Sequence, residues 1–390
     1  MPTSPTLDFA LQNRTNSNTV FAYITGRALD NGFALFLLRR DGRTPYFPNS
    51  PSSTLAPLTE DCAIRLGAPG STTTITIPRL AGARVYFSVD RPLTFLLNPG
   101  PALVEPSVTN PSDPNIDIDW CFAEFTYNSN EIYANITYVD FVSIPISLTL
   151  ETASKVTKHV SGMPANGLDT VCDRLRAQDN NDRAGWSRLI VKQRGSDRNL
   201  RALSPNTGIV TDNNLFRGYY QPYVDAVWNK YTHFTLAINT QNNIWGTLTG
   251  QVRNGVFDIG GQLFTQPSAA DIFSCSTGPF AEMGSPLRGA IIARFSAAFH
   301  RSTLLNDPDR SFPDTPPPFY AERITNHYSR IVHEVNLDRR GYAFPYDDVA
   351  ASGGKDESGA VNAPDPRLLT IAVGGNNAFL APLAPPRDEL

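Results

Sequence analysis

The sequence predicts a mainly β protein with a mixed α/β part, and three observations support this fold class. Proline accounts for 32 of the 390 residues, a content that disfavours long helices. Charged residues make up only 18% of the chain, while 22 Phe, 14 Tyr and 4 Trp supply enough apolar surface for a folded core. Short β-branched or aromatic stretches fill the first part of the chain, and apolar residues at helical spacing appear in the middle.

Residues 1–150 are predicted to form an antiparallel β-sandwich or barrel domain. Short stretches with strand composition lie between Gly, Pro and Asp residues. These stretches are Thr73–Ile77, Arg84–Ser88, Leu93–Leu97, Trp120–Tyr127 and Ile132–Val142. Asn128–Glu131 separates the last two and has the composition of a hairpin loop, which favours antiparallel pairing.

Residues 151–340 are predicted to form a mixed α/β domain. Apolar residues at helical spacing mark three helices, and two strand-like stretches lie between them. The helices are expected at Leu168–Gln178, Tyr223–Tyr231 and Ala290–Phe299, and the strands at Leu189–Val191 and Phe234–Ile238. A final strand, Arg367–Val373, is expected to return to the first domain, so that a segment of about 340–375 completes it and 376–390 form a tail.

Charge and hydropathy exclude two classes of partner. The net charge is −4, and Lys and Arg are scattered without a basic stripe, so we expect no binding to nucleic acid. No apolar run approaches the roughly 18 residues that a membrane span needs, so we expect no membrane insertion. Met1–Leu7 shows no signal-peptide pattern, and we interpret the similarity of Arg387–Leu390 to a retention signal for the endoplasmic reticulum as chance.

The cysteines leave two redox states open. The chain contains Cys62, Cys121, Cys172 and Cys275. They allow two disulfides or four buried free thiols, and the sequence does not decide between these. Since they are widely spaced and form no C-x-x-C pair, we expect no zinc site made of four thiolates.

Motifs of several enzyme classes are missing. The chain has no Gly-x-Ser-x-Gly elbow, no phosphate-binding glycine loop and no His-Glu-x-x-His pair, because Leu337 stands where the second histidine should follow His333. We therefore expect His327 and His333 to be hydrogen-bonded structural residues. Asp347 and Asp348 are expected to form a turn or cap rather than a metal site.

Glu124 is the first candidate for chemistry, because it lies inside the apolar strand Trp120–Tyr127. Alternation places it on one face with Trp120, Phe122, Thr126 and Asn128. A glutamate among aromatic and hydroxyl side chains suits a sugar groove, in which rings stack on a pyranose. Desolvation by Phe122 would raise the pKa of Glu124 and keep it protonated as a general acid. The alternative is a glutamate exposed on the wet face of a sheet, which the spacing alone favours.

Asp140 is the second candidate, since glycoside hydrolysis needs two carboxyl groups and an acid in an apolar strand is costly unless it is paired or functional. A turn centred on residues 129–130 pairs Glu124 with Asn135 and leaves Asp140 five residues further along. At ~3.3 Å per residue this is roughly 16 Å, more than the ~6.5–9.5 Å between the carboxyls of inverting enzymes. We therefore expect a bulge or sharp bend near Tyr138.

With these two carboxylates the sequence resembles glycoside hydrolase family 64, the β-1,3-glucanases related in fold to thaumatin-like proteins. The resemblance covers about residues 20–375. The stretches that carry it are Gly82–Ser88, Asn98–Pro106, Glu124–Thr126 with Asn135–Phe141, Leu200–Pro205, and Asn326–Glu334 running into Gly341–Asp348.

The resemblance implies a β domain and a mixed α/β domain on either side of a wide cleft. It also implies an inverting endo-β-1,3-glucanase that needs no cofactor and hydrolyses laminarin, curdlan or fungal cell-wall glucan to laminari-oligosaccharides such as laminaripentaose. The family's general acid falls on Glu124 and its general base on Asp140. Its sugar contacts in this segment map to Thr126, Asn128, Tyr133 and Thr137.

Two positions depart from the family's pattern. Tyr133 stands where some members carry Trp, and Ser276 follows Cys275 where the family tends to have Asp. We expect a secreted monomer that binds β-1,3-glucan, and an intracellular location stays open. The rival interpretation is a non-catalytic thaumatin-like β-glucan-binding protein, because such a protein would also have an acidic, aromatic cleft.

Overall fold

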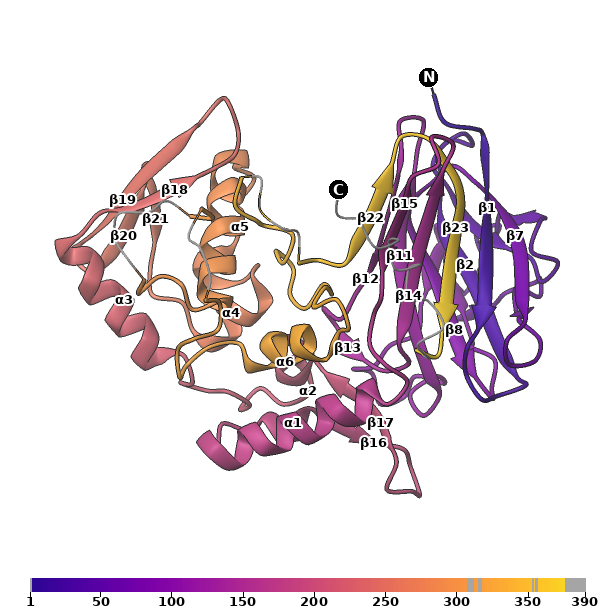
Figure 1. Ribbon diagram of the computed structural model, residues 1–390, viewed down its shortest axis with the longest axis horizontal. Helices are drawn as coiled ribbons and strands as arrows, with labels where there is room; N and C mark the ends of the chain where they lie inside the picture. The colour runs from indigo at the N-terminus through magenta and orange to yellow at the C-terminus, as the bar shows by residue number, and fades with distance from the viewer. Residues whose placement is uncertain (1, 307–311, 315–317, 353, 355–356, 376–390) are drawn as a thin grey trace, which may run out of the picture.

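The computed structural model shows strands in two large sheets beside a smaller mixed unit (Figure 1). Within the described residues, no helix is both long enough and apolar enough to cross a membrane. The described residues are 2–306, 312–314, 318–352, 354 and 357–375, so the expected tail 376–390, with its Arg387–Leu390 ending, lies outside them.

The first large sheet joins the two ends of the described chain. The last strand of the chain, β23 (Pro366–Val373), pairs in parallel with the first, β1 (Thr6–Asn13), and antiparallel with β14 (Ile146–Thr152). The predicted return of the final strand is therefore confirmed. In spatial order the strands are β15 (Thr157–Val160), β14 (Ile146–Thr152), β23 (Pro366–Val373), β1 (Thr6–Asn13) and β7 (Thr72–Pro78).

The second large sheet contains the predicted hairpin, next to the strand at one edge. In spatial order it contains β22 (Ala360–Ala363), β12 (Ile132–Ile136), β11 (Asp119–Tyr127), β8 (Leu80–Val89), β2 (Val20–Ala28), β3 (Ala34–Leu38) and β4 (Pro45–Tyr46), and β6 (Ile64–Arg65) pairs with β2. Phe9 of β1 and Phe125 of β11 meet between the two sheets, with ring centroids 5.0 Å apart. The two sheets therefore pack as a sandwich. The barrel alternative is wrong, because within the described residues each sheet is an open row of strands.

One predicted strand is shorter than expected. Leu93–Leu97 contributes only its last two residues to β9 (Leu96–Asn98). The backbone N–H of Leu93 donates to the Tyr23 hydroxyl, and that of Thr94 donates to the Asn115 side chain. These donors are therefore satisfied by side chains instead of a neighbouring strand. β9 lies between β10 (Ala102–Val104) and β5 (Ala56–Pro57).

The mixed unit contains an antiparallel sheet covered by helices (Figure 1). The strands are β18 (Leu236–Asn239), β19 (Thr247–Arg253), β20 (Val256–Ile259) and β21 (Gln262–Phe264), and the helices include α3 (Gln221–His233), α4 (Ala269–Ser274) and α5 (Pro286–His300). Trp228 of α3 and Phe295 of α5 both contact Phe257 of β20, with centroids 5.5 and 5.4 Å away. The predicted helical spacing is confirmed, since Val224, Trp228 and the other apolar residues of α3 face this core.

Shorter elements connect the sandwich to the mixed unit. They are α1 (Gly167–Asp182), η1 (Trp186–Leu189), α2 (Pro205–Thr211), η2 (Gly278–Phe280), α6 (His327–Val335), and a small sheet of β13 (Phe141–Val142), β17 (Asn199–Leu203) and β16 (Ile190–Lys192). Ser204 caps α2, and its side chain accepts a hydrogen bond from the Thr207 backbone N–H. Both the predicted Leu168–Gln178 helix and the Leu189–Val191 strand are present, with η1 taking the first strand residue.

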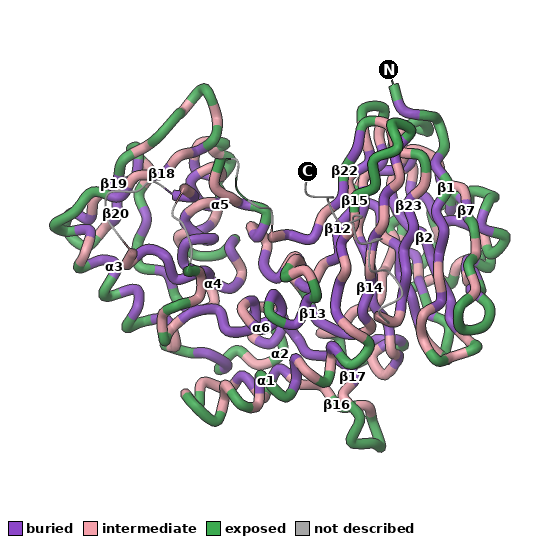
Figure 2. The backbone as a smooth tube through the Cα atoms, viewed as in Figure 1, coloured by how far each residue is buried: buried purple, intermediate pink, exposed green. Residues whose placement is uncertain are grey.

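The state of the four cysteines, which the sequence left open, is that of buried free thiols. Figure 2 shows buried residues along the strands of both large sheets and along α5. All four cysteines are buried, and all four are free thiols. Burial raises the pKa of the Cys62 and Cys172 thiols to about 12, so neither is a reactive thiolate near neutral pH.

Candidate active site

Glu124 lies at the centre of a row of side chains that crosses four neighbouring strands. In the register of the sheet it pairs with Asn135 of β12, as predicted, and with Arg84 of β8. Arg84 in turn pairs with Thr25 of β2. The Arg84 Nε lies 3.3 Å from the Glu124 Oε1, and the same guanidinium lies 2.8 Å from Glu105 Oε2. Glu124 is therefore an ion-paired carboxyl whose side chain is 39% exposed.

The aromatic neighbours of Glu124 on its face are not available to a sugar. Trp120 is 2% exposed and Phe122 is 7% exposed. Phe141, the residue after Asp140, covers both rings, with centroids 4.8 and 6.1 Å away. The expectation that this face presents rings to a pyranose is therefore wrong for Trp120 and Phe122. Their bulk still contributes to the burial that raises the Glu124 pKa.

Asp140 reaches Glu124 because the chain leaves the sheet. The predicted strand Ile132–Val142 breaks after Ile136, and Thr137 bridges to Tyr342 in a parallel pair. The Tyr138 carbonyl accepts a hydrogen bond of 2.7 Å from the Tyr328 hydroxyl, and the Asp140 carbonyl accepts one of 2.9 Å from the Ser204 backbone N–H. The predicted bend near Tyr138 is thus confirmed, and it is held by α6 and by the start of α2.

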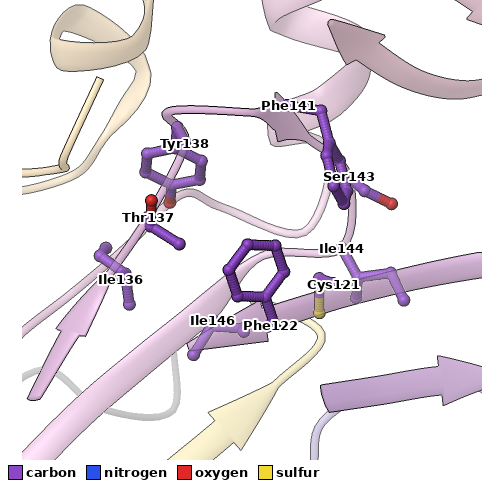
Figure 3. A pocket seen from close by; sticks show the side chains of 9 residues that line it. All are labelled: Cys121, Phe122, Ile136, Thr137, Tyr138, Phe141, Ser143, Ile144 and Ile146. Atoms are coloured by element: carbon purple, nitrogen blue, oxygen red, sulfur yellow. The ribbon is translucent and has the colours of Figure 1, made fainter. Parts of the chain in front are cut away.

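A small cavity lies under this bend (Figure 3). The ring of Phe122 and side chains from both sides of Asp140, among them Tyr138 and Phe141, surround it. Its volume is about 10 Å³, which is room for about one water molecule. The cavity is therefore too small for a sugar, and the substrate site must lie elsewhere.

A larger pocket of about 470 Å³ contains both candidate carboxyls. It is lined by Arg84, Glu124, Tyr133, Asn135, Thr137, Val139, Asp140, Tyr342, Pro345 and Asp348. Four of the six predicted site residues, Glu124, Tyr133, Thr137 and Asp140, thus share one pocket. The bend makes this possible, since a straight strand would separate the two carboxyls.

The other two predicted residues lie outside that lining. Thr126 is on β11 and pairs with Tyr133, so it continues the same face toward the end of the hairpin. Asn128 is in the turn, and its side-chain oxygen accepts hydrogen bonds from the backbone N–H groups of Asn130 and Glu131. The Asn128 side chain therefore fixes the turn, and its role toward a sugar stays a prediction.

The surrounding protein raises the pKa of both carboxyls, although Asp140 is exposed at the pocket surface. Burial raises the pKa of Glu124; the charge and hydrogen bond of Arg84 oppose this shift, and the charges of Asp140 and Glu105 add to it. Burial also raises the pKa of Asp140, against the charge of Arg84. A carboxyl with a raised pKa retains its proton closer to neutral pH, which is what a general acid needs.

Comparison with known proteins identifies the family. A family model described as β-1,3-glucanase matches residues 5–373, nearly the whole chain. The chain belongs to glycoside hydrolase family 64.

Relatives and solved structures agree with this family 64 assignment. Glucan endo-1,3-β-glucosidases of Arthrobacter sp. and Cellulosimicrobium cellulans are 31% and 30% identical over 289 residues. That alignment covers 71% of this chain and 50% of each relative, so the chain spans about half their length. A laminaripentaose-producing β-1,3-glucanase in complex with laminaritetraose is 31% identical, with a TM-score of 0.82 over 95% of this chain and 99% of that one. A β-1,3-glucanase domain from Clostridium beijerinckii, 22% identical, shares the fold with a TM-score of 0.72 over 95% and 98%.

The pocket contains residues that the sequence did not indicate as site residues. Arg84, Tyr342 and Asp348 line it and Glu105 lies beside it; of these only Asp348 was considered from the sequence, as part of a turn or cap. Arg84 and Glu105 are charged residues within two of the stretches that carry the family resemblance, and their charge was the available signal. Nothing in the sequence pairs Tyr342 with Thr137, because the two are far apart along the chain.

A buried cluster behind the pocket wall has the composition of a metal site. His333, Asp347 and Glu357 each bring one ligand atom to within 4.8 Å of the others. Arg301 already supplies positive charge, with its Nη2 lying 3.1 Å from Asp347 Oδ1, and His333 Nε2 lies 2.9 Å from Asp347 Oδ2. We therefore interpret the cluster as an internal ion-pair network. His327 Nε2 lies 3.1 Å from the Arg323 carbonyl and His333 Nδ1 lies 3.3 Å from the Arg339 carbonyl, so the expected hydrogen bonding of both histidines is confirmed, and their purely structural role stays a prediction.

Proposed function

We propose that this chain is an inverting endo-β-1,3-glucanase that hydrolyses β-1,3-glucan to laminari-oligosaccharides. The observation that carries the proposal is the single pocket shared by Glu124 and Asp140, two carboxyls from a strand and from the bend beside it. Family membership and the similarity to a glucanase solved with laminaritetraose support β-1,3-glucan as the substrate.

In the proposed reaction, protonated Glu124 donates its proton to the glycosidic oxygen while Asp140 accepts a proton from water. The water oxygen bonds to the anomeric carbon as the bond to the leaving oxygen breaks, so the β-linked sugar is released as the α-anomer. Both carboxyls line the pocket of about 470 Å³, which is large enough to hold a sugar unit together with the attacking water.

The sugar contacts follow from the same pocket. Tyr133 is half-buried in its lining and offers a ring for stacking on a pyranose, and Thr137 offers a hydroxyl. Thr126 and Asn128 lie further along the hairpin, and we propose that they contact a more distant unit of the same glucan chain.

We also propose a thaumatin-like β domain of residues 1–150 completed by about 340–375, and a mixed domain of 151–340, with the glucan in a wide cleft between them. Because β15 (Thr157–Val160) pairs with β14, this short segment of 151–340 belongs with the β domain. The pairing of β23 with β1 and β14 supports the completed β domain, and the separate sheet β18–β21 supports the mixed one. The protein would act outside the cell as a monomer on polysaccharide, which is too large to enter.

Proton NMR of the anomeric region during digestion of laminarin tests the function and the mechanism together. Early α-anomer signal would support hydrolysis with inversion. Early β-anomer signal would mean retention and would remove Asp140 as the water-activating base. Glucan binding without new reducing ends would instead establish the binding-protein interpretation.

A pair of variants tests the role of Glu124. Glu124→Gln is expected to abolish turnover and to retain binding of laminari-oligosaccharides, because the amide keeps the size of the side chain but has no acidic proton. Glu131→Gln, at the turn of the same hairpin and outside the pocket lining, is the matched control and should retain activity. Normal turnover in Glu124→Gln would exclude this residue as the acid.

A further inference from the structure

The Arg84 guanidinium is shared between two carboxyls. Its Nη1 donates to Glu105 Oε2 at 2.8 Å and lies 3.2 Å from the Tyr86 hydroxyl, while its Nε donates to Glu124 Oε1 at 3.3 Å. The guanidinium carbon lies 4.8 Å from the centre of the Phe122 ring. The shorter contact is the one to Glu105, although Glu124 lies directly beside Arg84 in the sheet.

Glu105 reaches this position from outside the sheet. It follows β10, and its Oε1 accepts a hydrogen bond of 3.4 Å from the hydroxyl of Thr25 on β2. Thr25, Arg84 and Glu124 form a cross-strand row on β2, β8 and β11, so Glu105 contacts the row at Thr25 and at Arg84. The Glu105 carboxyl is thereby held on the side of the guanidinium away from Glu124.

We propose that Glu105 is a positioning residue of the site, which shares the Arg84 guanidinium with Glu124 and thereby limits how strongly Arg84 stabilises the ionised form of Glu124. The inference rests on the proposed role of Glu124 as the general acid. An arginine beside an acid favours loss of the acid's proton, whereas the proposed reaction requires the proton to be present.

The surroundings of Glu124 either favour or oppose the ionisation of its carboxyl. Arg84, from β8, favours the ionised carboxyl, and burial, Asp140 and Glu105 oppose ionisation. The pocket lining also contains Asp348, Tyr342 and Tyr133, and Arg84 contacts the Tyr86 hydroxyl. Arg84 is therefore the cation of this group, and the balance between its two carboxyl partners determines the charge that Glu124 experiences.

Two variants that break the same ion pair should act in opposite directions. In Glu105→Gln, Glu124 is the remaining carboxylate partner of Arg84, so Glu124 should lose its proton at a lower pH. The high-pH limb of the pH profile of kcat/KM on laminarin should therefore move to lower pH. Arg84→Met removes the cation, so that limb should move to higher pH. Arg84→Lys keeps the charge and should bring the limb back toward its wild-type position. Simple loss of a structural ion pair would move the limb in the same direction in both variants, and that result would overturn the proposal.

A titration without substrate separates this inference from the proposed function. Carboxyl carbons of ¹³C-labelled glutamates are followed by NMR, and the Glu124 signal is assigned by its absence in Glu124→Gln. Its midpoint should fall in Glu105→Gln and rise in Arg84→Met; if neither midpoint moves, the inference is wrong even in an active enzyme. If the variants show these shifts but the wild-type protein does not hydrolyse laminarin, the proposed function fails and the charge sharing stands. Glu105→Ala replaces Glu105→Gln if the latter does not fold.

Discussion

Replacing Asp347 by asparagine is expected to destabilise the protein by about 3–5 kcal/mol, the usual cost of removing one partner from a buried ion pair. Asp347 is 0% exposed, and its partners Arg301 and His333 are 4% and 7% exposed. One carboxylate oxygen contacts Arg301 at 3.1 Å, and the other contacts His333 at 2.9 Å and the Ala343 backbone N–H at 2.9 Å. The variant removes the Asp347 charge from both cations, because an amide cannot neutralise either one, and Glu357 remains as the other acid of the cluster.

The size of this effect depends on pH in a defined direction. Burial lowers the pKa of His333, but the charge and hydrogen bond of Asp347 outweigh it and raise that pKa. The stability that His333 contributes is therefore present below its unfolded pKa and is lost as the pH rises through its raised folded pKa. Burial raises the pKa of Asp347, but His333 and Arg301 lower it overall, so its contribution is present above its unfolded pKa and is lost as the pH falls through the folded one.

Equilibrium unfolding in urea, followed by tryptophan fluorescence at several pH values, measures the effect. The loss in Asp347→Asn should be largest between the two pKa values and smaller above that of His333, where only the contact with Arg301 is removed. Asp348→Asn is the matched control, because Asp348 is the exposed neighbour in sequence and should change stability little. A difference of less than about 0.5 kcal/mol between Asp347→Asn and wild type, the range of ordinary surface substitutions, would refute the reasoning.

Three further predictions concern the bend, the thiols and a glycine. Tyr328→Phe removes the hydrogen bond to the Tyr138 carbonyl, so it should lower the free energy of unfolding by about 1 kcal/mol. It should also lower kcat more than it raises KM. An unchanged kcat would mean that the bend keeps its shape without this bond. The four buried thiols should react with Ellman's reagent only after denaturation, and reaction of the native protein would contradict their burial. Gly162→Ala should destabilise the protein more than Gly195→Ala. Both glycines have a positive φ, but only at Gly162 would the new Cβ clash with a backbone oxygen, that of Ile146. Equal midpoints of thermal unfolding would contradict this clash.

Much of the fold was predictable because local patterns determined it. The hairpin register that pairs Glu124 with Asn135 followed from the composition of the turn and from strand alternation. The need for a bend followed from the reach of an extended chain, and it placed the break near Tyr138. The way the bend is held did not follow, since Tyr328 and Tyr342 belong to distant parts of the sequence.

Sequence reasoning about the site failed where one face of a strand is covered by a later segment. Alternation placed Trp120 and Phe122 beside Glu124 correctly, but it does not say whether that face is solvated. Phe141 covers both rings, so Trp120 and Phe122 belong to the core, whereas Glu124 on the same face lines the pocket. The contact of Arg84 with Glu105 was equally hidden, because side chains from a loop and a strand meet only after both are folded.

The central position of β23 has a consequence for how the protein is made. Asp8 of β1 pairs with Leu368 of β23, and β23 also separates β1 from β14. A ribosome adding roughly 5–20 residues per second needs on the order of tens of seconds to travel between these two partners. During that time the nascent β1 has one unpaired edge, and the first large sheet is divided into two parts. The sandwich is therefore completed only after β23 has been synthesised, so a message truncated shortly before β23 would yield a chain with an exposed strand edge and a tendency to aggregate.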